Sequence, residues 1–292
     1  MQKISKKERV ERRKTALFML PSLLGVAVFF IIPFFIVIYY SLIDNPINAE
    51  FVGLENFIGL IGNGSFKIAT KNTVQFSLIA LPLAIIIPLF LATLLMNKLP
   101  GKSVFRTILI SPYMVPTASI ILIINVIFNY NGALNSFLDG FGVDKIDWLR
   151  GEFSRYIVVL LYLWKNVGYN MILFMAALAA IPKDMIDAAS IDGASRMRVF
   201  FKIKLPYLSS SIFFVGLLSL INSFKVFREV YLLTGNYPNE NLYMLQHFMN
   251  NTFKNLNYQR LSSAAILMCI VMIAIISLLL YIDARFGKDI EE

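Results

Sequence analysis

The sequence predicts an all-α integral membrane protein with six transmembrane helices and a short cytoplasmic helix between the fourth and the fifth. Hydrophobic residues make up 58% of the 292 residues and charged residues only 15%, with a mean hydropathy of +0.68. This composition is too apolar for the surface of a soluble protein. Apolar stretches recur at bilayer-crossing length, about 20 residues for about 30 Å of hydrocarbon. Basic residues gather beside alternate stretches, as they do on the cytoplasmic side of membrane proteins.

Six stretches are long and apolar enough to span a membrane. The predicted spans are 16–43, 73–96, 107–137, 155–180, 207–233 and 261–282. The apolar run of the first span exceeds the roughly 7 to 15 residues of a signal peptide, and no A-x-A cleavage site follows it, so we expect it to be retained. Prolines within the spans are expected to kink or start helices, because neighbouring helices can satisfy the freed carbonyl groups.

The positions of lysine and arginine predict the orientation of the spans. Residues 1–15 are strongly basic, and further basic residues follow the second, fourth and sixth spans, whereas the opposite connections carry fewer. Both termini are therefore expected in the cytoplasm. The chain divides into a basic cytoplasmic N-terminal segment (1–15), one transmembrane domain (16–284) and a cytoplasmic tail (285–292).

The residue inventory argues against several other functions. The net charge is +9, but the basic residues do not form a soluble face with interleaved aromatic residues, so no nucleic-acid partner is expected. Cys269 and His247 are the only residues of their kinds, which leaves no disulfide framework and no metal site. No nucleophile with a neighbouring base and no pair of acids lies at bilayer depth, so we expect no catalytic residue and no enzyme activity.

The connection between the fourth and fifth spans, residues 182–206, is the most informative segment. Proline fits a first helical position, glycine takes the left-handed turn that ends a helix, and serine caps a following helix. Pro182, Gly193 and Ser195 therefore predict two short helices, the second of which ends at Pro206. The second helix carries an apolar face with a basic rim.

The same connection matches a family pattern in register. The pattern is E-A-A, three residues, G, nine residues, I, one residue and L-P, and it marks the membrane subunits of ABC importers. The matching residues are Asp187, Ala188, Ala189, Gly193, Ile203, Leu205 and Pro206. Asp192 and Ala194 complete the longer form found in the carbohydrate branch, while Asp187 replaces its glutamate. The chain therefore resembles the permease subunits of maltose and glycerol-phosphate type importers.

The resemblance covers about residues 17–284. It is carried by F-V-G-L-E-N-F at 51–57, N-T at 72–73, F-R-T at 105–107, P-Y at 112–113, G-A-L-N at 132–135, W-L at 148–149, W-K at 164–165 and F-K-V-F at 224–227. Residues 234–238, T-G-N-Y-P, depart from the T-G-G-P that is common in the family.

The resemblance implies a transporter of several subunits in the bacterial inner (cytoplasmic) membrane. Its expected partners are a second, homologous permease that completes a heterodimer, two cytoplasmic ATPase subunits, an extracytoplasmic binding protein, membrane lipid and a di- or oligosaccharide substrate. ATP and Mg are expected on the ATPase subunits and no cofactor on this chain, in which no G-x-x-x-x-G-K-[ST] sequence occurs. The residues expected to couple the chain to the ATPase are Asp187, Ala188, Ala189, Asp192, Gly193, Ala194, Phe200, Leu205 and Pro206.

Polar residues inside the spans predict a path for the solute, because such groups are costly in a membrane and usually face a cavity. The candidate path residues are Asn125, Asn166, Tyr169, Asn170, Asn222, Lys225 and Glu229. Amides and aromatic faces suit an uncharged sugar, and the excess of basic residues also allows an anionic one. The alternatives are that the asparagines only join helices, that Lys165 reaches the surface, and that Lys225 pairs with Glu229.

A secondary transporter or channel without an ATPase remains the competing interpretation, because six spans with asparagines near the midplane fit that class as well. The loop motif favours the importer.

Overall fold

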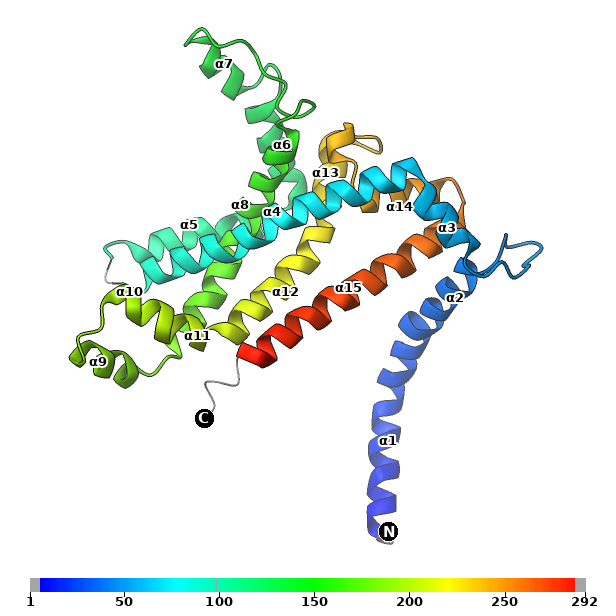
Figure 1. The fold of residues 1–292 in the computed structure, drawn as a ribbon, viewed down its shortest axis with the longest axis horizontal. Coiled ribbons are helices and arrows are strands. Elements are labelled where there is room, and N and C mark those ends of the chain that lie inside the picture. The colour runs from blue at the N-terminus through cyan, green and yellow to red at the C-terminus, as the bar shows by residue number, and fades with distance from the viewer. Residues whose placement is uncertain (1–5, 98, 287–292) are drawn as a thin grey trace. The chain divides into compact units, whose positions relative to one another are not determined.

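A computed structural model describes residues 6–97 and 99–286, and the chain folds as helices (Figure 1). Six helical segments are long and apolar enough to cross a membrane, which confirms the predicted number of spans. They are Leu17–Ser41, Gly64–Leu95, Thr117–Asp139, Ser154–Ala179, Ser209–Thr234 and Tyr258–Asp283. Parts of the predicted N-terminal segment (1–5) and tail (287–292) lie outside the described residues.

The chain divides into two units, of which the first contains residues 1–63 and 252–270. Its first span is built from α1 (Lys6–Val26), a π-helical turn (Ala27–Ile31) and α2 (Ile32–Ser41), and α3 (Glu55–Gly62) follows. Asn56 donates hydrogen bonds from Nδ2 to the carbonyls of Ser41, at 3.1 Å, and Ile43, at 2.8 Å. The F-V-G-L-E-N-F segment therefore secures the turn from the first span into α3.

The second unit contains residues 64–251 and 271–292. Its helices are α4 (Gly64–Leu95), α5 (Lys102–Met114), α6 (Thr117–Phe128), α7 (Ala133–Asp139), α8 (Ser154–Ala179), α12 (Ser209–Lys225) and α13 (Phe227–Thr234), with the 3-10 turn η3 (Glu240–Leu242). The chain then continues through α14 (Leu245–Lys254) and α15 (Tyr258–Phe286), which extend across both units. Helix α8 is the most buried span, with α4, α5 and α12 packed around it.

Close packing of α5 on α8 requires a glycine. A Cβ atom added at Gly168 would lie 2.0 Å from the carbonyl oxygen of Leu109, far inside van der Waals contact. Small residues allow this kind of backbone approach between membrane helices. Asn170, also on α8, donates hydrogen bonds to the Ala84 carbonyl of α4 at 2.9 Å and to Ser219 Oγ of α12 at 3.0 Å. Residues of α8 thus hold the helices on either side of it.

The third and fifth predicted spans, 107–137 and 207–233, are each made of more than one helix, and Pro116 starts a helix as expected for a proline within a span. Val115 is extended and Pro116 precedes α6, so α5 is a separate helix and the third span starts at Thr117. The reason is that proline lacks an N–H and excludes the residue before it from the helical region. In the fifth span α12 and α13 meet at Val226, which keeps a right-handed helical conformation and whose carbonyl accepts a hydrogen bond from the Val230 N–H at 3.1 Å.

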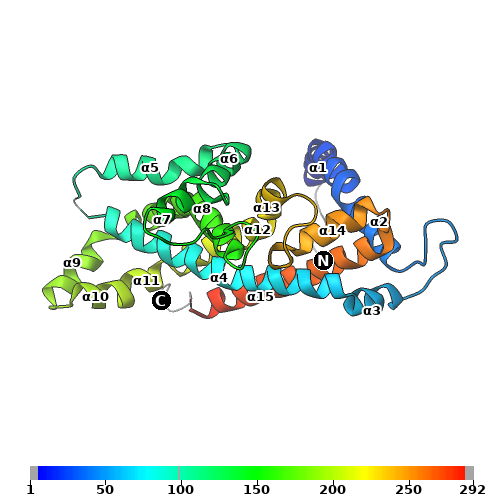
Figure 2. The same ribbon diagram turned by 90° about the horizontal axis from the view of Figure 1, so that it is seen from above.

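The connection between the fourth and fifth spans contains α9 (Lys183–Ile191), α10 (Arg196–Val199), a π turn (Phe200–Lys204) and α11 (Leu205–Tyr207). These elements lie together at one end of the second unit (Figures 1 and 2). Gly193 has φ of 75° and Ser195 Oγ accepts a hydrogen bond from the Arg198 N–H at 3.3 Å, which confirms the predicted turn and cap.

Two details of this connection were predicted wrongly. Pro182 is the N-cap of α9 rather than its first residue. Pro206 does not end the second helix, because the wider π turn before it, closed by a bond from the Leu205 N–H to the Phe200 carbonyl, carries the helix past the missing proline N–H.

Candidate functional site

A polar cavity of about 320 Å³ lies inside the second unit. Helices α5, α8, α12 and α13 supply its walls. The lining residues are Tyr113, Leu161, Tyr162, Lys165, Asn166, Asn222, Lys225, Val226, Arg228 and Glu229. Its volume is at the lower end of the range of about 300 to 1,000 Å³ that is typical of small-molecule sites.

A partly buried ion pair forms one wall of this cavity. The Lys165 Nζ lies 2.5 Å from Glu229 Oε1 and also donates a hydrogen bond to Thr117 Oγ1 at 2.9 Å. Arg228 Nη2 donates to the same hydroxyl at 3.0 Å. The alternative that Lys165 reaches the surface is wrong, because its side chain lines the cavity. The alternative that Lys225 pairs with Glu229 is also wrong. The Glu229 carboxylate bonds to Lys165 of α8 instead, and no ion pair between Lys225 and Glu229 is found among the described residues.

The structure brings together some of the predicted path residues and separates others. Asn166, Asn222, Lys225 and Glu229 all line the cavity. Asn222 Nδ2 donates to Asn166 Oδ1 at 3.3 Å. Tyr169 stacks on the cavity-lining Tyr113, with the ring centroids 4.7 Å apart and the planes within 12°.

Three predicted residues do not line the cavity: Tyr169, which contacts only its wall residue Tyr113, and Asn170 and Asn125. Asn170 is buried, and its amide nitrogen joins α8 to α4 and α12, which is the helix-joining alternative. Asn125 lines a different pocket, of about 690 Å³, at the opposite end of α6 and α13. Sequence reasoning did not identify Thr117 and Tyr113 as part of this region, because only the break at Pro116 orients the start of α6 toward Lys165.

The connection 182–206 combines anchored and exposed residues. Phe200 and Leu205 pack against a buried cluster that includes Leu178 and Leu208. The predicted coupling residues on and after α9 are exposed or partly exposed: Asp187, Ala188, Ala189, Asp192, Gly193 and Ala194. Large apolar side chains of the same segment, Ile191, Met197 and Phe201, are also exposed, Ile191 by 86%. Exposed apolar groups on a rigidly anchored segment are typical of a protein interaction surface.

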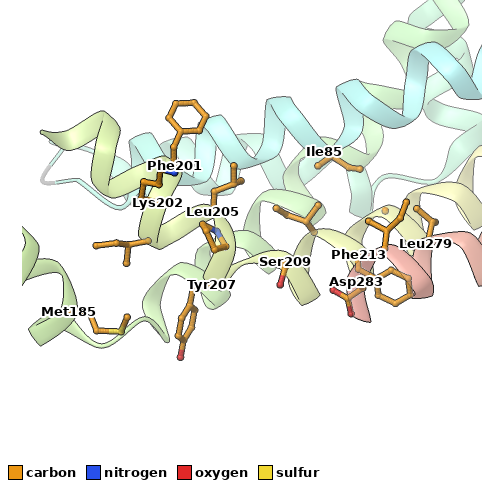
Figure 3. Close-up of a pocket in the computed structure, with 15 residues that line it drawn as sticks. Ile85, Met185, Phe201, Lys202, Leu205, Tyr207, Ser209, Phe213, Leu279 and Asp283 are labelled. Atoms are coloured by element: carbon orange, nitrogen blue, oxygen red, sulfur yellow. The ribbon is translucent and has the colours of Figure 1, made fainter. Parts of the chain in front are cut away.

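An apolar cavity of about 750 Å³ lies beside this connection (Figure 3). On one side it is lined by Phe201, Lys202, Leu205 and Tyr207, and on the other by Phe213 of α12 with Leu279 and Asp283 of α15. The connection is therefore incompletely packed against the ends of these spans.

His247, which the sequence places in a polar connection, is fully buried with an exposed fraction of 0%. Its Nδ1 accepts a hydrogen bond from the Met244 N–H at 3.2 Å. Its ring packs edge-to-face with the Phe227 ring, with the centroids 4.6 Å apart. Burial lowers the pKa of His247 to about 4. The imidazole is therefore neutral in the folded protein at neutral pH.

Acidification is expected to destabilise the segment around α14 through His247. Its folded-state pKa lies below the unfolded value of about 6.5, so its contribution is complete above pH 6.5 and is lost as the pH falls toward 4. The loss amounts to about 3 kcal/mol. Thermal unfolding of the detergent-solubilised protein between pH 7 and 4.5 measures it against His247→Asn, whose amide oxygen keeps the acceptor but cannot be protonated. Equal pH slopes for the two proteins would contradict the prediction.

Apolar spans arranged around a charged and polar cavity define a multi-pass membrane transport subunit. The chain matches the family described as the binding-protein-dependent transport system inner membrane component over residues 84–290, and it belongs to that family. It is therefore a permease subunit of the ABC importer class, and the interpretation as an independent secondary transporter or channel is set aside.

Several relatives agree with the resemblance to carbohydrate-type permeases. The trehalose/maltose transport system permease protein MalF of Thermococcus litoralis is 31% identical over 291 residues, which cover 98% of each chain. The arabinooligosaccharides transport system permease protein AraP of Bacillus subtilis is 31% identical over 90% of this chain and 86% of its own length. The sn-glycerol-3-phosphate transport system permease protein UgpA of Yersinia enterocolitica is 33% identical over 76% of this chain and 77% of its own length.

The fold also matches solved structures. A chain of a bacterial ABC transporter involved in the import of the acidic polysaccharide alginate superimposes with a TM-score of 0.84, at 21% identity, covering 96% of this chain and 99% of that one. A second structure of a bacterial alginate transporter, in complex with an alginate pentasaccharide-bound periplasmic protein, matches with the same score at 20% identity. At these identities the likeness shows the fold.

Proposed function

We propose that the chain translocates a di- or oligosaccharide that an extracytoplasmic binding protein delivers, by alternating access driven by ATP hydrolysis in separate subunits. The observation that carries this proposal is the cavity between α5, α8, α12 and α13. Its amides can donate and accept hydrogen bonds, and its tyrosines offer flat apolar faces, as sugar hydroxyls and rings require. The names of the relatives support the same substrate class.

Coupling is assigned to α9 and the turn that follows it. In this proposal α9 docks in a cleft of a cytoplasmic ATPase, with Ala188 and Ala189 allowing close approach and Gly193 setting the bend. Two ATPase subunits hold ATP and Mg, a second permease completes the heterodimer, and both termini face the cytoplasm. The anchoring of Phe200 and Leu205 in the packed core supports this role, because a docking element must transmit force to the spans.

Reconstitution tests the proposed function. Proteoliposomes containing this chain, its partner permease and the ATPase are expected to accumulate labelled sugar only with ATP on the ATPase side and binding protein on the other. Full uptake by this polypeptide alone would overturn the proposal, as would assembly without any ATPase.

Asn222→Ala is expected to raise the KM for sugar uptake without unfolding the protein. Loss of one hydrogen bond to the solute corresponds to about 3- to 10-fold in affinity. Stability changes little because the lost bond to Asn166 Oδ1 is long, at 3.3 Å, and both residues line the cavity, while Asn166 keeps the bond from its Nδ2 to the Tyr162 carbonyl. Asn170→Ala is the matched control, in which thermal stability falls while the KM is retained. An unchanged KM and solute affinity in Asn222→Ala would dismiss Asn222 as a contact.

A further inference from the structure

The pocket at the far ends of α6 and α13 is large and rich in hydrogen-bonding groups. It has a volume of about 690 Å³ and is formed by Asn125, Asn129, Tyr130, Asp147, Leu149, Arg150, Leu233, Thr234, Tyr237, Pro238 and Asn239. Arg150, Tyr130 and Tyr237 are exposed, and within residues 6–97 and 99–286 no residue bonds to the guanidinium or to either phenolic hydroxyl. Residues with a carboxylate, a guanidinium, amides and two phenols thus line one open pocket, where these groups can bond to a solute in place of water.

A fully bonded asparagine holds the segment that carries several of these groups. Asn135 is 0% exposed, and its Nδ2 donates to the carbonyls of Tyr130, at 2.9 Å, and Ile146, at 2.7 Å. Its Oδ1 accepts from the Ile146 N–H at 3.2 Å and from Trp148 Nε1 at 2.9 Å. Both donors and both acceptor positions of the amide are therefore used. The wall formed by residues 130–150 is preorganised rather than a loose loop.

A hydrogen bond joins residues 237–239, on the opposite wall of the pocket, to residues 130–150. Asn239 Nδ2 donates a hydrogen bond to the Arg150 carbonyl, and Asn239 Oδ1 caps the turn at Asn241. Tyr237 and Pro238 lie on the chain just before this contact. The departure from the family's T-G-G-P, in which Tyr237 and Asn236 occur, therefore falls on the pocket itself.

Helices α6 and α13 connect this pocket to the polar cavity of about 320 Å³ described above, which we call the inner cavity. Arg228 and Glu229 at the start of α13 line the cavity, while Leu233 and Thr234 at its end line the pocket. Helix α6 packs against α13, and its first residue, Thr117, bonds to Lys165 and Arg228 of the cavity wall. At 1.5 Å per residue, Arg228 and Thr234 are about 9 Å apart along the helix axis. The two spaces thus lie about two turns of helix apart.

We propose that this outer pocket, formed between α6, α13 and the segment 130–150, is a second carbohydrate-binding site that receives the sugar before it enters the inner cavity. The acid and the guanidinium balance in charge, so the site takes neutral sugar hydroxyls, with the exposed ring of Tyr237 stacking on a sugar face. This inference rests on the proposed function and adds a separate reception step to it.

Thiol protection tests the site directly. Cys269 is the only cysteine, so Asn129→Cys in a Cys269→Ser background places one thiol at the pocket. The assembled transporter in nanodiscs is treated with a membrane-impermeant maleimide, with and without maltose, trehalose or maltotriose, and labelling is followed on this chain. At a sugar concentration ten times the dissociation constant, labelling is expected to slow about tenfold. Asp139→Cys on the exposed α7 is the matched control and should not respond.

A second variant reports on transport. Tyr237 is exposed, so Tyr237→Ala does not disturb the fold. It is expected to raise the KM for uptake by about 2- to 10-fold with kcat retained, and Tyr237→Phe, which keeps the ring, should restore most of the affinity.

The outcomes separate the two proposals. Sugar uptake by the Cys269→Ser transporter without protection of the thiol at position 129 overturns the outer site and leaves the proposed function intact. Equal protection by sugar-free binding protein would show a protein-docking surface and also overturn it. Absence of uptake for every sugar tried would overturn the proposed function and the outer site together.

Discussion

Replacement of Ile191 by aspartate is expected to abolish ATP-driven uptake while leaving the membrane domain folded. The side chain is 86% exposed at the end of α9, so the change removes no contact within the chain. In a docked complex the new carboxylate would be buried without a partner, at a cost of several kcal/mol. A loss of 3 kcal/mol already weakens association by about 100-fold. Co-purification with the ATPase and sugar-stimulated hydrolysis measure the effect.

The control is the same substitution, isoleucine to aspartate, at another exposed position. Ile47 is 92% exposed, in the connection that follows the first span. Ile47→Asp is expected to leave the ATPase bound and hydrolysis stimulated. A stable, sugar-stimulated complex containing Ile191→Asp would contradict the coupling role assigned to α9.

Glu229→Gln is expected to destabilise the protein by about 3 to 5 kcal/mol and to stop transport. The side chains of Glu229 and Lys165 are only 8% and 16% exposed, and Oε1 lies 2.5 Å from Nζ. Removing one charge leaves the other buried without its counter-ion, which costs more than the pair contributes. The Thr117 hydroxyl that remains near Lys165 carries no charge and cannot compensate. Thermal unfolding in detergent and uptake in proteoliposomes measure the two effects.

The double variant Lys165→Met, Glu229→Gln distinguishes an ion-pair effect from a general defect. It is expected to recover most of the lost stability, because no uncompensated charge remains. Lys225→Met is the matched control, since Lys225 lines the same cavity but forms no ion pair with any described residue. Equal destabilisation by Lys225→Met and Glu229→Gln, or no recovery in the double variant, would contradict the explanation.

The sequence alone does not show which polar residues of a span face a cavity and which bond to a neighbouring helix. Asn166 and Asn170 are four residues apart on one helix, and both were predicted to line the solute path because they are polar residues inside a span. The structure places Asn166 at the cavity and Asn170 between α4 and α12. Polarity inside a span indicates that a residue avoids lipid, but neighbouring helices decide whether it meets a cavity or another backbone.

The junctions within the third and fifth spans were the features of the site that the sequence analysis did not locate. Residues 107–137 and 207–233 are predominantly apolar, although the second stretch contains Lys225, Arg228 and Glu229, and each was predicted as a single span. The break at Pro116 starts α6 at Thr117, whose hydroxyl accepts hydrogen bonds from Lys165 and Arg228. Pro116 was visible in the sequence, but membrane helices often tolerate proline, and only the packed structure distinguished a kink from a break.

By itself the sequence determined the number of spans, the turn at Gly193 and the family. Span length, the left-handed conformation and motif spacing are local properties that residues express without distant partners. Only the tertiary structure decided that Lys165 pairs with Glu229, that His247 is buried, and that polar residues divide between an inner cavity and an outer pocket. These outcomes depend on how the helices pack against one another. Contacts between residues far apart in the chain, such as the close approach of Gly168 to Leu109, determine that packing.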